Sequence, residues 1–191
     1  MNSQLGHEAV LKQTIREGLA VIVVGTGVSI SATYDPKTKQ SHPQASWTGL
    51  LENGLQWLKD HKLMDEDEAV AQLTLLKKKP QTHRLISVAE DVAEGMGTAN
   101  SKHFRDWLEG TVGSIKAQNR SVLDALDAIR QHGNLLATTN YDGLLLDGHS
   151  QLSPITWRDP DALLAAVRKP PKKRQSGPSL SLRSARMTIK I

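Results

Sequence analysis

The sequence predicts an α/β protein: a parallel sheet with a large helical insertion between its first two strands. Two short segments, 19–24 and 134–139, stand out: the first is rich in Val and Ile, the second contains Leu135, Leu136 and Ala137, and each gives way to polar, turn-forming residues. This is typical of buried strands in parallel sheets. Between them the apolar residues recur at helical spacing, and strands separated by helices indicate an α/β architecture. At 191 residues, one domain is the expectation.

The chain begins with a predicted helix that leads into the first strand. Its expected inward face consists of Val10, Leu11 and Ile15. Gly18 ends the helix, and residues 19–24 follow as a buried strand.

A glycine loop follows the first strand. Gly25 and Gly27 allow the backbone to turn sharply and to approach a ligand closely. The dinucleotide-binding pattern has a third glycine, where this chain has Ile30. A tight turn without a ligand therefore explains these two glycines equally well. The polar stretch 33–44 is predicted to be a mobile loop beside the site.

Helices are predicted next, beginning with one capped by Ser46. Its apolar positions are Trp47, Leu50, Leu51, Trp57 and Leu58. Three further helical patterns are marked by Ala69, Val70, Leu73 and Leu76, by Leu85, Ile86, Ala89 and Val92, and by Phe104, Trp107 and Leu108.

A helix from about Asn119 to Gly133 leads into the second strand. Its inward residues are Val122, Leu123, Leu126 and Ile129. Residues 154–157 are a candidate third strand, and Asp159 is a candidate cap for a helix over 160–167. Because ligands of such sheets bind outside the carboxyl ends of the strands, the loops 25–29 and 138–142 are expected to face one crevice.

Composition divides the chain into a body and a tail. Residues 168–191 hold eight basic residues and no acidic one; removing these eight from the 24 leaves 16 basic against 20 acidic residues, a net charge of −4 for 1–167. We therefore predict a domain over 1–167 and a basic, disordered tail over 168–191. The chain has no cysteine and no apolar run that could span a membrane. These features predict a soluble intracellular protein, cytoplasmic or nuclear, without a metal site or a membrane partner.

Two motifs resemble the sirtuin superfamily, in its divergent sirtuin-like branch of NAD-consuming domains. Gly25-Thr26-Gly27-Val28-Ser29 resembles the loop that holds the phosphates and ribose of NAD. Thr138-Thr139-Asn140-Tyr141-Asp142 resembles the Thr-Thr-Asn-(Tyr/Phe)-Asp form of that branch, and the Trp47 region is also similar. The resemblance covers about residues 15–165. It implies a doubly wound, Rossmann-like fold, of which this chain holds the N-terminal part, and NAD as substrate or ligand.

The resemblance also implies roles for these residues. The amides of Gly25 to Val28 would hold the pyrophosphate, Ser29 would contact ribose or phosphate, and Thr139 would complete the binding set. Asn140, the expected catalytic residue, would orient the ribose or the attacking water, and Asp142 would hydrogen-bond the nicotinamide carboxamide. The family reaction is hydrolysis of NAD or ADP-ribosyl transfer at the nicotinamide N-glycosidic bond. Lysine deacylation is disfavoured, because the zinc module of sirtuins needs cysteines.

One family feature is missing. The family uses a His followed by Gly well downstream of the Asn-x-Asp segment, whereas only His149, followed by Ser150, comes after Asp142 here. The expectation is a chain from a truncated or alternatively spliced message that binds NAD weakly or not at all and has little or no turnover; with a complete site it would resemble an NAD glycohydrolase.

Two alternatives stay open. One is a non-catalytic module that oligomerises with itself or with full-length relatives through exposed sheet edges. The other is a nucleic-acid binder that uses the basic tail, although the acidic body makes nucleic acid the less expected partner.

Overall fold

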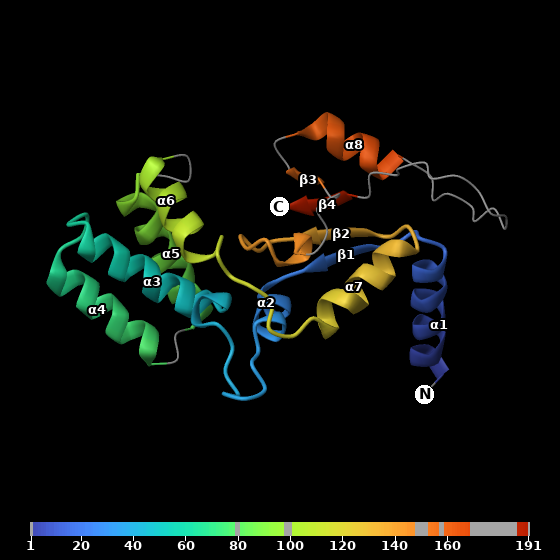
Figure 1. Cartoon of the computed structure of the whole chain (residues 1–191), viewed down its shortest axis with the longest axis horizontal. Helices are drawn as coiled ribbons and strands as arrows, with labels where there is room; N and C mark the ends of the chain where they lie inside the picture. The colour runs from blue at the N-terminus through green and yellow to red at the C-terminus, as the bar shows by residue number, and fades with distance from the viewer. Residues whose placement is uncertain are drawn as a thin grey trace. The chain divides into compact units, whose positions relative to one another are not determined.

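The computed structural model describes residues 2–78, 81–97, 101–147, 153–156, 159–168 and 187–190. The chain forms two compact units (Figure 1). The sheet unit comprises Met1–Val28, Arg120–Asn140 and Leu144–Ile191; the helical unit comprises Ser29–Asn119 and Tyr141–Gly143. The chain therefore passes from one unit to the other inside each of the two motifs described above.

The sheet unit confirms the α/β class and the parallel sheet. Its elements are α1 (Asn2–Arg16), β1 (Val21–Val24), α7 (Ser121–Gln131), β2 (Leu135–Thr138), η2 (Leu144–Leu146), β3 (Ser153–Thr156), α8 (Pro160–Arg168) and β4 (Met187–Lys190). The strand order is β1-β2-β4-β3, and all neighbours are parallel. The predicted helical insertion between the first two strands is also confirmed, because α3 to α6 lie between β1 and β2 in the sequence.

One face of β1 and β2 is buried. Val24 and Leu136 form a small core cluster with Leu126 of α7, and all three are at most 8% exposed. Partly buried apolar residues pack around this cluster: Ile22, Val28, Val122 and Leu145. This agrees with the predicted inward face of α7. On the same helix the buried Arg130 is paired with Asp127.

The other face of β1 is exposed, which corrects the prediction of a fully buried strand. Leu19, Val21 and Val23 alternate along the strand and are 59, 56 and 59% exposed. β1 lies at one end of the strand order, so its outer edge has no strand partner among the described residues. The predicted inward face of α1 is wrong in the same way, since Val10 and Leu11 are exposed. An apolar period shows which residues can be buried together, but not whether another element covers them.

Polar contacts tie α1, β1 and α7 together at the start of the sheet. Asn134 is buried; its Oδ1 accepts from the amide of Ala20 (2.9 Å), and its Nδ2 donates to the carbonyls of Ile15 (2.8 Å) and Ile129 (2.9 Å). Gly18, at φ 72°, ends α1 as predicted. A Cβ there would lie 2.4 Å from the carbonyl oxygen of His132, so only glycine fits this approach.

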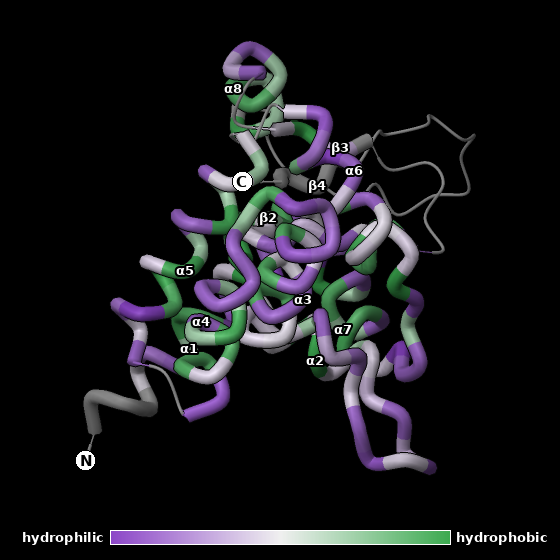
Figure 2. Tube along the Cα trace, turned by 90° about the vertical axis from the view of Figure 1, so that its left-hand side faces the viewer, coloured by the Kyte–Doolittle hydropathy of each residue, from purple (hydrophilic) through white to green (hydrophobic). Residues whose placement is uncertain are grey.

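The helical unit has a core cluster larger than the cluster of Val24, Leu126 and Leu136. Its helices are α3 (Trp47–Asp60), α4 (Glu66–Lys77), α5 (Thr82–Gly95) and α6 (Lys102–Thr111), preceded by η1 (Pro43–Ala45). Buried residues from all four helices form one cluster, in which Leu55 and Leu58 of α3 are 0% exposed. Figure 2 shows the apolar period as green segments alternating with purple ones along α5. The helices approach closely at Gly54, where a Cβ would lie 2.8 Å from Cγ1 of Val92.

Local signals set the boundaries of several elements. The hydroxyl of Ser46 accepts from the amide of Gly49 (3.0 Å), which confirms the predicted cap of α3. Asp159 accepts from the amide of Ala162 (3.0 Å) at the start of α8, again as predicted. The polar stretch 33–44 forms a turn closed by the bridge between Asp35 and Gln40.

The end of the chain differs in part from the predicted disordered tail. Met187–Lys190 pair with β2 and β3 as strand β4. Residues 169–186 of the tail, and with them His149 and Trp157, lie outside the described residues. Across the part of the chain that is described, no helix combines the length and apolar character needed to cross a membrane.

Candidate functional site

Within the sheet unit, the glycine loop and the second motif start side by side. β1 and β2 pair in parallel with Val24 opposite Thr138, so both strands end at the same level. The amide of Thr139 donates to the carbonyl of Val24 (3.2 Å) and continues the pairing by one residue. Gly25 and Thr139 are therefore neighbours at the carboxyl edge of the sheet, where α/β proteins bind their ligands.

The glycines of the loop are not required by the protein's own packing. A Cβ on Gly25 would meet only Oγ1 of Thr139, at an ordinary contact distance of 3.5 Å, and a Cβ on Gly27 would meet nothing within 4 Å. Neither glycine has a positive φ. Gly18 is the contrast, because both its φ and its close contact demand glycine. The space beside Gly27 would let a ligand lie directly against the backbone.

Helix α2 (Thr26–Ala32) begins inside this loop. The amide of Val28 donates to the carbonyl of Gly25 (3.0 Å), so this amide is already used within the turn. The first turn of a helix leaves its leading amides without intrahelical acceptors. Of the amides expected to hold a pyrophosphate, those of Thr26 and Gly27 therefore fit that role better than that of Val28.

The end of β2 directs the second motif. Thr138 is 4% exposed, and its Oγ1 accepts from the amide of Asn140 (3.0 Å), which turns the chain immediately after the strand. Thr139 is exposed and Asn140 is half-buried. The buried threonine thus acts on backbone geometry, while the two following side chains are accessible.

Within the helical unit, Ser29 and Asp142 bring the two motifs into direct contact. The hydroxyl of Ser29 donates to Oδ2 of Asp142 (2.5 Å) across 113 positions of sequence. Ser29 is 2% exposed, and its carbonyl accepts from the hydroxyl of Thr33 (2.8 Å). The resemblance implied that Ser29 contacts ribose or phosphate. In this structure the hydroxyl of Ser29 donates to Asp142 and the residue is buried, and the implied contact with ribose or phosphate stays a prediction.

The eight predicted site residues therefore form two groups. In the sheet unit, Gly25 to Val28 lie at the same sheet edge as Thr139 and Asn140; in the helical unit, Ser29 is bonded to Asp142. Sequence analysis missed Arg120, whose guanidinium contacts Asp147 just after the second motif. The spacing of four between Arg120 and Asp124 predicts an ion pair on a helix. No sequence pattern predicts the contact of Arg120 with Asp147.

Among the described residues, no group of three or more His, Cys, Asp or Glu is arranged to hold a metal ion. Comparison of the chain with models of protein families, with curated proteins and with solved structures gives no match.

Proposed function

We propose that this chain binds NAD, using the glycine loop of residues 25–29 and the segment 138–142. The proposal keeps the resemblance of these motifs to the divergent sirtuin-like branch. In this reading the amides of Thr26 and Gly27 bind the pyrophosphate, Asn140 orients the ribose or a water, and Asp142 accepts from the carboxamide of nicotinamide.

The observation that carries the proposal is the register of β1 and β2. With Val24 opposite Thr138, the glycine loop and the Thr-Thr-Asn segment begin at one edge of the sheet, although more than a hundred residues separate them. The bond between Ser29 and Asp142 is a second link between the same motifs. Turn chemistry alone would require neither of these pairings.

The residue types suit cleavage of the bond between nicotinamide and ribose. As this bond breaks, its electron pair leaves with nicotinamide and positive charge develops on the ribose. An amide such as that of Asn140 can hold water near this carbon without adding positive charge, and a carboxylate such as Asp142 favours the developing charge. Water then bonds to the ribose carbon and loses a proton, which needs an acceptor.

The sequence offers no residue that matches the family's histidine as acceptor of the proton from the attacking water. His149 is the sole histidine after Asp142 in the sequence, and no glycine follows it. We therefore propose weak NAD binding with little or no turnover.

Isothermal titration with NAD, combined with a nicotinamide-release assay, tests this function. We expect saturable binding with a Kd near or below about 1 mM and release at the level of a buffer control. Robust release that is lost in Asn140→Ala would overturn the proposed inactivity. The absence of any saturable binding would overturn the proposed ligand.

A second candidate, self-association through β1, is favoured by a separate observation. Leu19, just before β1, and Val21 and Val23 of the strand are each more than half exposed, and β1 has neither a charged residue nor a proline that would protect its edge. Such an edge can pair with the same edge of a second copy.

Sedimentation velocity over a range of concentrations distinguishes this candidate. Self-association predicts a dimer that Val21→Lys dissociates and that the control Val70→Lys, at an exposed position of α4, leaves intact. A wild-type monomer at all concentrations would exclude this candidate.

A further inference from the structure

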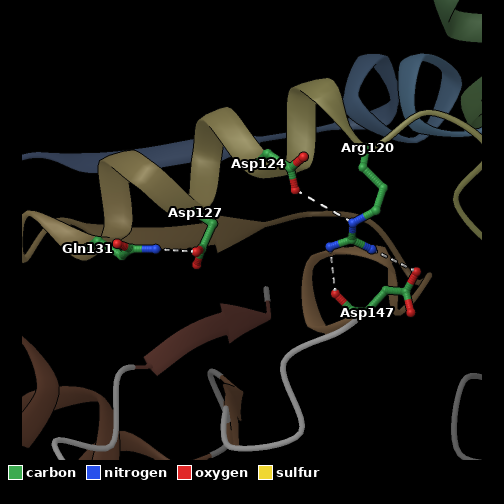
Figure 3. Close-up of polar contacts among 5 residues, drawn as sticks. All are labelled: Arg120, Asp124, Asp127, Gln131 and Asp147. Atoms are coloured by element: carbon green, nitrogen blue, oxygen red, sulfur yellow. Dashed lines mark hydrogen bonds and ion pairs between the residues drawn. The ribbon is translucent and has the colours of Figure 1, made fainter.

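An arginine contacts the far end of the loop that follows β2. Arg120 lies directly before α7, and Figure 3 shows its guanidinium reaching over to Asp147. Its Nη1 lies 3.4 Å from Oδ2 of Asp147, and its Nη2 donates to the main-chain carbonyl of the same residue (3.2 Å). Nε of Arg120 lies 3.6 Å from Oδ1 of Asp124, one turn along α7, which steadies the arginine itself.

The contact with the carbonyl is the informative one. An ion pair between side chains can persist while the backbone moves, but a bond to the carbonyl fixes the position of the main chain at Asp147. The amide of Asp147 is in turn bonded to the carbonyl of Leu144 (3.1 Å), and Leu144 is 2% exposed. The segment 144–147 is therefore anchored from outside by Arg120 and from inside by a buried leucine.

The near end of the same loop is fixed at the sheet. Thr139 donates to Val24, and Asn140 donates to the hydroxyl of Thr138. Residues 139–147, here named the site loop, are thus tied at both ends, and they contain Asn140 and Asp142. The tie at Arg120 uses an exposed side chain, whereas the bonds of Thr139 and Asn140 use backbone groups and the buried Thr138.

We propose that Arg120 is a positioning residue that holds the site loop in its binding-competent conformation by clamping Asp147. It touches no ligand and acts through Asn140 and its neighbours. The consequence for ligand affinity rests on the proposed NAD function, whereas the clamp on the loop does not.

The expected size of the effect follows from the exposure of the pair. The side chains of Arg120 and Asp147 are 42 and 35% exposed, so the clamp stays at the modest level of surface ion pairs. Exposed ion pairs contribute up to about 1 kcal/mol. Removing a pair of that strength lowers the ratio of clamped to released site loop by about fivefold. Because only molecules with the clamped site loop bind NAD well, the affinity for NAD is expected to fall by up to about fivefold.

Residue-resolved amide hydrogen exchange of the full chain tests the clamp without any ligand. In Arg120→Ala we expect the amides of Asn140 and Asp147 to exchange about fivefold faster, while those of Leu136 and Ala137 in β2 keep their rates. Arg120→Lys can occupy one of the two acceptors and should give intermediate rates. Lys102→Ala, which removes a comparable exposed ion pair with Asp106 in the helical unit, should change neither set.

Titration of the same variants with NAD supplies the second readout. Weaker binding by Arg120→Ala with partial rescue by Arg120→Lys supports the positioning role. Unchanged exchange of the site loop in Arg120→Ala, or equal acceleration of the β2 amides, would overturn the clamp. If exchange responds as expected but the wild-type chain binds no NAD, the clamp is supported and the proposed function is overturned.

Discussion

In the helical unit Leu55 and Leu58 are fully buried, whereas in the sheet unit Val21 and Val23 are more than half exposed. Both units are built from regular elements with clear apolar periods. The difference is that α3 packs against helices on several sides, while β1 lies at the edge of a short sheet and is covered on one face only. Among the described residues, more of the buried apolar side chains therefore lie in the helical unit than in the sheet unit.

The largest expected effect is the loss of a large side chain from the helical core. Leu55→Ala should reduce the free energy of unfolding by about 2 to 5 kcal/mol, because its site is enclosed by packed neighbours. Urea denaturation followed by tryptophan fluorescence measures this, since Trp47, Trp57 and Trp107 all lie in the helical unit. The matched change Val21→Ala should cost less than about 0.5 kcal/mol. Equal losses for the two variants would refute the comparison.

The next effect probes the polar contacts of the sheet unit. Asn134→Ala removes three hydrogen bonds: the amide of Ala20 loses its acceptor, whereas the carbonyls of Ile15 and Ile129 keep the bonds that they accept from the amides of Gly18 and His132. We expect a loss of about 1 to 3 kcal/mol, seen as faster amide exchange in β1 and β2. Gln131→Ala, at the exposed end of α7, is the control and should have little effect. Unaltered exchange in Asn134→Ala would show that apolar contacts alone hold this unit.

Two glycines of the sheet unit should respond in opposite ways. Gly18→Ala should destabilise the unit by about 1 to 3 kcal/mol, because alanine meets both a positive φ and the carbonyl of His132. Gly27→Ala should leave thermal unfolding unchanged or slightly improved, since its Cβ would enter open space and alanine favours the helix. Thermal unfolding of both variants decides the matter, and a large loss in Gly27→Ala would mean that the fold itself needs this glycine.

The smallest effect is the removal of a helix cap. Ser46→Ala loses the bond to the amide of Gly49 and should cost about 1 kcal/mol. Ser46→Asp keeps an acceptor at this position and should restore most of the loss. Denaturation of both variants distinguishes capping from other roles of the hydroxyl, because a general packing role would not be rescued by aspartate.

Local signals made much of the fold predictable. The caps Ser46 and Asp159 and the helix-ending Gly18 and Gly133 act within a few residues of chain, so they can be recognised before any tertiary contact is known. The two strands and their parallel pairing followed from short apolar runs separated by helices. These elements agree closely with the structure.

Local signals did not predict which apolar faces are covered by another element, nor which residues distant in sequence make contact. The exposed face of β1 has the same alternation as a buried one, and only the sheet order shows that β1 is an edge. The same holds for Asn134, which joins three elements, and for Arg120, whose partner Asp147 lies 27 positions away. The motifs predicted that Ser29 and Asp142 contact a common ligand. They did not predict the direct hydrogen bond between these two residues.

The most direct test of the proposed site is isothermal titration of NAD into the wild-type chain and into Gly27→Ala. These proteins should unfold at the same temperature, so that a difference in binding reports on the space beside the glycine loop alone. We predict saturable binding by the wild type and binding at least about tenfold weaker, a loss of about 1.4 kcal/mol or more, in Gly27→Ala. Equal binding by both proteins, or no binding by the wild type up to about 10 mM NAD, would contradict the assignment of this loop to NAD.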